Sequence, residues 1–317
     1  MLDEFHSLPE TFDNELDAQI AKWYSNPPQV WPKRDAPYFS PSAATKCPRE
    51  LYMKAMRAKK DIKKIQPHQS RWQKIGTVIG DMIQREILAI ERNFEKLTGN
   101  KPRFTFERNP DGTPMFEEFA KKNVLVEHVG ERFYLYGAPD GIMRYVTDDG
   151  EVIRVGLEIK SKQQSPSKTS TKSMTRAQES HEAQTALYAY MYDCEYYIVL
   201  YVNGSKRAWD MSAEEYADFP DIRAFCRRIT DADRAPLFDK FAAITKAIRE
   251  KQPPAIDLDG WKFNEYKNAI ASSMTDEEFD ELKAQVRRIL KSGLPDWKKQ
   301  AYYDAFDFIK NVREAKA

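Results

Sequence analysis

The segment 152–160 most constrains the fold, because apolar and polar residues alternate along it without a break. Its apolar members are Ile153, Val155, Leu157 and Ile159. A period of two is typical of a β-strand with one face in a core, so the polar residues in between point to the opposite face. We therefore expect Glu158 and Lys160 to lie next to each other on one face of a strand.

A second acidic residue, Asp140, lies in a Gly-Ala-Pro-Asp-Gly break that follows the predicted strand 132–136. Two carboxylates about 4 Å apart repel by roughly 4 kcal/mol at an effective dielectric of 20, so a converging pair should bind a cation or a proton. We expect Asp140, Glu158 and the carbonyl of Ile159 to bind magnesium, which takes one or two carboxylates together with water and phosphate oxygens. Lys160 could then orient a water or neutralise charge on phosphate, which suits phosphodiester hydrolysis.

The Glu-x-Lys spelling is a weak signal by itself, because it recurs at Glu265, Glu281 and Glu314. Those three copies lie in segments that are predicted to be helix or loop, where residues two apart do not share a face. For Glu158 and Lys160, an exposed ion pair at the end of a strand is the alternative.

Three motifs follow one another along the chain, namely Pro139-Asp140, Glu158-x-Lys160 and Gln184-x-x-x-Tyr188. This order resembles the PD-(D/E)XK nuclease superfamily, and specifically its RecB-like exonuclease group. The segment Ser40–Arg49, which ends in Cys-Pro-Arg, is similar to one that opens many of these domains. Gln184 and Tyr188 are four residues apart and share one helical face, from which both could contact substrate.

The resemblance implies an α/β fold, with a central mixed sheet flanked by helices as in restriction endonucleases. We expect this core at 40–211, after an N-terminal helix and extended arm at 1–39 and before a helical region at 212–317. The resemblance also implies DNA as the partner and Mg²⁺ as the cofactor, with Mn²⁺ as the alternative.

Members of the group often carry a metal-binding His in a Gly-x-x-x-His setting, where this chain has Gly76-Thr-Val-Ile-Gly80. Glu86, beside the apolar stripe of the same predicted helix, is our expected substitute ligand, and Asp81 and Gln84 stay open as alternatives. A surface Glu86 paired with a neighbouring Arg is equally compatible with the sequence.

The chain has three cysteines, Cys47, Cys194 and Cys226. The four-cysteine iron–sulfur cluster of some group members therefore cannot form, and we expect no such cluster. Three scattered thiols also make no disulfide framework, which fits a reducing cytoplasm.

The chain has 50 basic and 49 acidic side chains, so affinity for nucleic acid has to come from local patches. One basic run is Arg57–Lys64. The other, 161–176, directly follows Lys160 and would overhang the metal site. Its cations are Lys162, Lys168, Lys172 and Arg176. We expect them to bind the substrate strand, and a disordered polar linker is the alternative.

The remaining elements follow from periodicity and turn residues. Helices are expected at 9–24, 47–58 and 72–97, and a hairpin at 124–138. Strand 196–202 is expected to turn at Asn203-Gly204 into a strand at 206–211. Beyond residue 211 the signals are helical, with capping-box starts at Ser212 and Thr275.

We therefore expect a Mg²⁺-dependent deoxyribonuclease, an exonuclease more than an endonuclease, acting on ends or single strands in repair, recombination or phage replication. No long apolar segment or leader is apparent, so the expected location is the cytoplasm of a bacterial or phage-infected cell, with no membrane partner. One alternative is a nuclease-fold subunit with a weakened site that binds DNA or takes part in assembly. Another is a helical interaction scaffold.

Overall fold

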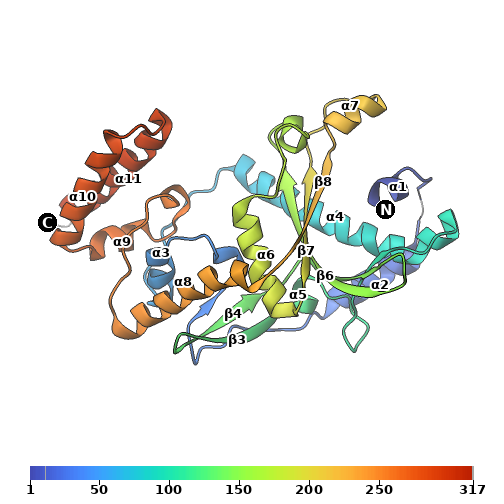
Figure 1. Ribbon diagram of the computed structural model, residues 1–317, viewed down its shortest axis with the longest axis horizontal. Coiled ribbons are helices and arrows are strands. Elements are labelled where there is room, and N and C mark those ends of the chain that lie inside the picture. The colour runs from blue at the N-terminus through green and yellow to red at the C-terminus, as the bar shows by residue number, and fades with distance from the viewer. Residues whose placement is uncertain (11, 316–317) are drawn as a thin grey trace.

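The computed structural model of the protein describes residues 1–10 and 12–315 and has two mixed sheets within a shell of helices (Figure 1). The three-stranded sheet has the order β1-β4-β3, made of β1 (Tyr38–Phe39), β4 (Glu131–Gly137) and β3 (Lys122–His128). The five-stranded sheet has the order β2-β5-β6-β7-β8, made of β2 (Phe104–Phe106), β5 (Gly141–Val146), β6 (Val152–Lys162), β7 (Tyr196–Asn203) and β8 (Ile222–Arg228). The predicted mixed α/β class with flanking helices is confirmed.

In the five-stranded sheet, β6 pairs with β7 in parallel and with β5 antiparallel, so β6 is an interior strand. The helices around the sheets are α1 (Leu2–His6), α2 (Asn14–Ser25), α3 (Pro48–Ala55), α4 (Pro67–Thr98), α5 (Glu117–Ala120), α6 (Glu179–Tyr192), α7 (Ala213–Asp218), α8 (Asp231–Glu250), α9 (Lys267–Ser273), α10 (Asp276–Leu290) and α11 (Asp296–Glu314). Three short 3₁₀ turns are η1 (Pro41–Ala43), η2 (Pro166–Thr169) and η3 (Trp261–Phe263). In the described part of the chain, no helix combines the length and the apolarity that a bilayer crossing requires.

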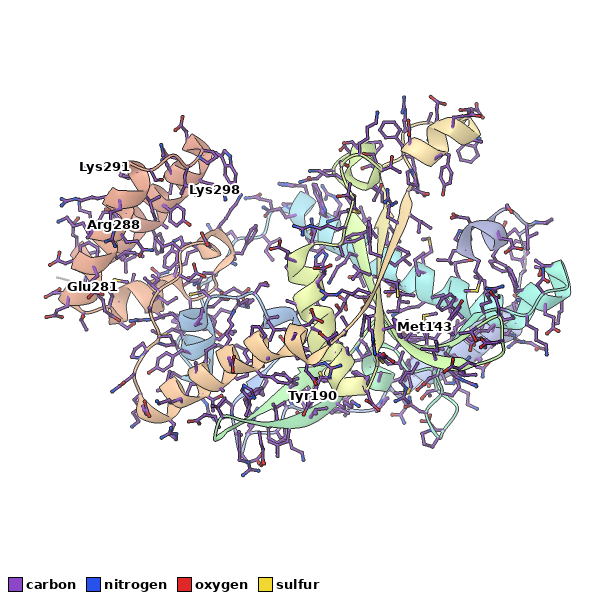
Figure 2. All side chains as sticks on the ribbon, viewed as in Figure 1. Met143, Tyr190, Glu281, Arg288, Lys291 and Lys298 are labelled. Carbon is purple, nitrogen blue, oxygen red and sulfur yellow. The ribbon has the colours of Figure 1, made fainter. Side chains whose placement is uncertain are left out.

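The two faces of β6 pack against different helices, as its alternating sequence predicts. Leu157 and Ile159 join a core cluster with Ile83 and Ile87 of α4. The opposite face of the sheet packs against α6, in a second cluster that includes Tyr197 of β7. Figure 2 shows one side chain from each side, Met143 on β5 in the α4 cluster and Tyr190 on α6 against the other. The polar face of β6 is therefore the face that α6 covers.

Gly156 allows the ring of Tyr197 to pack directly on β6. A Cβ at this position would lie 2.0 Å from a carbon of that ring, which is far inside van der Waals contact. The ring of Tyr197 is fully buried, so it has no room to move aside. A glycine in this strand is thus required by a close approach of a side chain.

Most of the predicted elements are confirmed, with shifts of a few residues at their ends. The hairpin is β3 and β4, and the predicted helices at 47–58 and 72–97 are α3 and α4. The capping boxes at Ser212 and Thr275 are both present, because each hydroxyl accepts from the backbone N–H of the Glu three residues later. The segment between α2 and β1 contains no helix or strand, as the run of prolines indicates.

The predicted strand at 206–211 is wrong, and β7 pairs instead with β8, which lies in the region that we expected to be only helical. A two-residue hairpin turn of type I′ needs positive φ at both positions, and neither Asn203 nor Gly204 has it. The fully buried side chain of Asn203 donates instead to the carbonyl of Ser165 (2.9 Å) and to Thr169 Oγ1 (3.0 Å). Asn203 thus fixes a neighbouring loop and does not form the hairpin turn.

The arginine of the Cys-Pro-Arg segment connects α3 to the C-terminal helices. Arg49 is 1% exposed, and its guanidinium donates to both carboxylate oxygens of Glu278 (2.5 and 3.2 Å) and to the carbonyl of Pro254 (3.1 Å). Glu278 also closes the α10 capping box with Thr275. A guanidinium this deep in the protein needs its counter-charge.

We expect Glu278→Ala to lower the free energy of unfolding by about 3 kcal/mol, because the substitution leaves the buried charge of Arg49 unpaired. Urea unfolding followed by circular dichroism measures the change. The neighbouring Glu277→Ala, at an exposed position in the same first turn, is the control and should leave the midpoint unchanged. Equal midpoints for both variants would contradict the role given to this ion pair.

Candidate active site

The site is formed where the break before β5 meets the polar face of β6. Asp140 lies immediately before β5, and its Oδ2 accepts a hydrogen bond from the backbone N–H of Ile159 (2.6 Å). Ile159 separates Glu158 from Lys160 on β6. The N–H and the carbonyl of one residue in an extended strand point to the same side, so the carbonyl of Ile159 is also directed toward Asp140.

Glu158 is 2% exposed, and its two carboxylate oxygens have different surroundings. Oε1 accepts from Lys160 Nζ (2.5 Å) and from Gln184 Nε2 (2.8 Å). Oε2 is buried and has no hydrogen-bond partner among the described residues. A buried carboxylate oxygen without a partner is costly, so this atom favours a proton or a cation.

The electrostatics of Asp140 lead to the same conclusion. Burial, followed by the nearby charge of Glu158, raises the pKa of Asp140 to about 8, while the Ile159 N–H and Lys160 oppose the shift. Burial also raises the pKa of Glu158, against Lys160 and Gln184. Two acids that are both difficult to ionise form a pair that a divalent cation would relieve.

The donor set fits a hard cation of the magnesium type. It consists of two carboxylates and one backbone carbonyl, and magnesium commonly binds one or two carboxylates and completes its shell with water and phosphate. Within residues 1–10 and 12–315, no group of three or more His, Cys, Asp or Glu side chains is arranged to hold a metal. The set would therefore leave coordination positions for substrate.

The first turns of α6 bring Gln184 and Tyr188 to the same place. The Gln184 side chain connects the two charged groups of β6, because it donates to Glu158 and its Oε1 accepts from Lys160 Nζ (3.2 Å). The Tyr188 hydroxyl lies beside Gly137, where a Cβ would come within 3.1 Å of it. Burial, followed by the charge of Glu158, raises the pKa of Tyr188 and keeps its phenol protonated.

On α4, Gln84 is the residue that the structure brings to the site. Its Nε2 donates to the backbone carbonyl of Asp140 (2.9 Å), and its buried Oε1 has no partner in the described chain. Glu86 lies on the other side of the apolar stripe and pairs with His6 (3.3 Å). Two residues correspond to about 200° around a helix, so Glu86 does not share the face of Gln84.

Sequence reasoning missed Glu117, which lies beside Asp140 at the start of α5. Its backbone N–H donates to the carbonyl of Pro139 (2.8 Å), and its carboxylate accepts from the Tyr24 hydroxyl (3.0 Å). Burial raises the pKa of Glu117, with further contributions from Asp81 and Asp140. Nothing in the local sequence around Glu117 distinguishes it from other surface acids.

The segment 161–176 is packed against the sheet. Met174 forms a small core cluster with Val199 and Tyr201 of β7, and Asn203 holds η2 in place. This packing contradicts the alternative of a disordered linker.

The four cations of that segment have different environments. Lys162 lies over the ring of Tyr201 (5.0 Å), and burial, followed by the charges of Lys168 and Lys160, lowers its pKa. Arg176 pairs with Glu179 (3.1 Å). Lys168 and Lys172 are exposed. Lys162 and Lys168 are thus the two that the structure brings near Lys160.

No model of a known protein family matches the chain, and no curated protein matches it. Among solved structures, the chain is similar to SSO0001 at 11% identity and a TM-score of 0.41, over 79% of this chain and 91% of that one. It is similar to an alkaline exonuclease from Laribacter hongkongensis at 12% identity and a TM-score of 0.36, over 68% and 89%. A phage-related exonuclease from Haemophilus somnus 129PT aligns at 13% identity and a TM-score of 0.25, over 41% and 60%. These likenesses are weak, and the chemistry of the site follows from its own residues.

Proposed function

We propose that this protein is a nuclease that hydrolyses phosphodiester bonds of DNA with the help of Mg²⁺ or Mn²⁺. The observation that carries the proposal is the meeting of Asp140 and Glu158 across Ile159, directly beside the ammonium of Lys160. Asp140, Glu158 and the Ile159 carbonyl would hold the cation. When bound, such a cation lowers the pKa of a water and stabilises negative charge on phosphate.

Lys160 is suited to contact the reacting phosphate. About a quarter of its side chain is exposed, so its ammonium can reach a phosphate oxygen while it remains paired with Glu158. A fixed positive charge in this place stabilises the negative charge that develops during hydrolysis. Gln184 holds the carboxylate and the ammonium in register, and is thus a positioning residue.

The substrate strand would approach from the side of segment 161–176. Lys162, Lys168, Lys172 and Arg176 would contact its phosphates, and Tyr188 would close the opposite side of the site. We propose action on ends or single strands, in repair, recombination or phage replication in a bacterial or phage-infected cytoplasm. Glu86 stays a proposal for the further ligand, and Gln84 is the better placed residue on α4.

The second candidate function is a DNA-binding or assembly subunit with a weakened site. It is favoured by Gln84, because α4 presents a neutral amide to the two carboxylates where a charged or imidazole ligand would bind a cation more tightly. The two functions differ in one measurable property. A nuclease must bind Mg²⁺ at this site, whereas a weakened subunit would bind DNA without it.

The test is to incubate the purified protein with end-labelled single- and double-stranded DNA, linear and circular, with Mg²⁺ or Mn²⁺ or with EDTA. We expect metal-dependent shortening of the linear molecules while the circles persist. Calorimetric titration with Mg²⁺ accompanies the assay. DNA binding without cleavage or Mg²⁺ binding would overturn the proposal and favour the weakened subunit.

A further inference from the structure

One stretch of the chain, residues 57–78, carries a local excess of positive charge that the rest of the molecule does not share. We call it the basic strap; it comprises the connection after α3 and the first three turns of α4. It contains seven Lys and Arg and one acid, in a chain with 50 basic and 49 acidic side chains. The cations are Arg57, Lys59, Lys60, Lys63, Lys64, Arg71 and Lys74.

Most of this charge is not neutralised within the protein. The single acid, Asp61, accepts from the backbone N–H groups of Lys267 (2.6 Å) and Asn268 (3.3 Å) at the start of α9. Lys60 and Lys63 share Glu265, at 2.9 and 3.9 Å. For Lys59, Lys64, Arg71 and Lys74, the described chain supplies no ion pair, and all four are exposed.

Large apolar side chains are exposed between these cations. Ile62 is 89% exposed, Ile65 57%, Trp72 46% and Ile75 49%. Trp72 and Ile75 are three residues apart and share a helical face, which leads one turn later to the buried Ile79. An apolar surface of this kind among unpaired cations is typical of a binding surface.

The strap reaches the edge of the proposed active site. The carbonyl of Trp72 accepts from Gln163 Nε2 (3.2 Å). A Cβ at Gly76 would lie 3.0 Å from the hydroxyl of Ser161, the residue directly after Lys160. Figure 1 shows the segment before α4 crossing from the C-terminal helices toward the sheet. A polymer lying along the strap would therefore lead to Lys160.

We propose that the basic strap binds a single-stranded polynucleotide, with Lys64, Arg71 and Lys74 on phosphates and Trp72 stacked on a base. The inference rests on the proposed function, since it gives the path by which the substrate strand reaches the site. Positive charge along one face matches the polyanion, and an exposed aromatic ring among apolar neighbours suits unpaired bases. A duplex, with its bases stacked inside, would use the cations and leave Trp72 unused.

The test measures binding of the full-length protein to a fluorescent 20-nucleotide single strand by anisotropy in EDTA, over a range of salt concentrations. Trp72→Ala should weaken binding roughly 10-fold or more with little change in salt dependence. Lys64→Ala/Lys74→Ala should lower the slope of log affinity against log salt by about 1.4, at about 0.7 per phosphate contact.

Matched controls use exposed residues at a distance. Lys96→Ala/Lys101→Ala removes two exposed cations at the other end of the 32-residue α4, which is roughly 48 Å long. Trp31→Ala removes an indole that is 74% exposed, outside the strap. Both should bind the strand like the unaltered protein.

Each outcome decides between the two proposals separately. Unchanged binding by the strap variants, beside cleavage by the unaltered protein in Mg²⁺, would overturn the strap and leave the nuclease proposal standing. Weakened binding without any cleavage would support the strap and overturn the nuclease. Equal losses on a 20-base-pair duplex for Trp72→Ala would overturn the single-strand assignment.

Discussion

Asp140→Asn is expected to lower the rate of DNA cleavage by at least about 1,000-fold, which corresponds to roughly 4 kcal/mol of transition-state stabilisation. The substitution removes one of the two carboxylates that would hold the cation. It keeps an oxygen that can accept from the Ile159 N–H, and it removes a charge that is buried beside Glu158. The melting temperature should therefore be unchanged or higher, while calorimetry detects little Mg²⁺ binding.

The control is Glu86→Gln, which alters an acid on the side of α4 that faces His6. Its cleavage rate should stay within about twofold of the unaltered protein, since the effect of a surface substitution is small. Cleavage by the Asp140 variant at a normal rate would refute the site. A large loss in the Glu86 variant would show instead that Glu86 is the further ligand.

Lys160→Ala should lower kcat by about 100- to 1,000-fold, as expected for the loss of one group that stabilises developing charge. Its effect on metal binding should be opposite to that of Asp140→Asn. Removing the ammonium leaves Glu158 more negative, so calorimetry should give Mg²⁺ binding at least as tight as before. This contrast separates a residue that acts on phosphate from one that holds the cation.

Lys162→Ala is the matched control on the same strand and the same face, with its ammonium over the ring of Tyr201. We expect it to raise KM and to leave kcat near its original value, because its contact with phosphate would be the same in ground and transition states. If the Lys160 variant behaved in this way too, Lys160 would be a binding residue and its role in the reaction would be wrong.

The residues of α4 show how far sequence could go in predicting the site. The apolar stripe of Ile79, Ile83 and Ile87 was readable, and these residues are buried as expected. Gln84 and Glu86 flank the stripe on opposite sides, and helical periodicity treats the two flanks as equivalent. Which flank meets Asp140 depends on how α4 is rotated against the sheet, and packing of the stripe on β6 sets that rotation.

Glu117 and the predicted strand at 206–211 failed for a related reason. Glu117 comes to the site through a hydrogen bond to Pro139, a contact between residues 22 positions apart that leaves no local pattern. Asn203-Gly204 has the composition of a tight turn, but the chain uses the Asn side chain to hold η2 and inserts α7 before β8 returns to the sheet. Tertiary contacts overrode local turn chemistry in both places.

The sequence by itself determined the relations that depend on backbone period. Alternation put Glu158 and Lys160 on one face of β6, and a spacing of four put Gln184 and Tyr188 on one face of α6. Only the tertiary structure decided that these two faces meet, that Asp140 bonds to Ile159 between them, and that α4 contributes Gln84. Period fixes the direction of a side chain relative to its own element, whereas the packing of buried side chains between elements fixes what it meets.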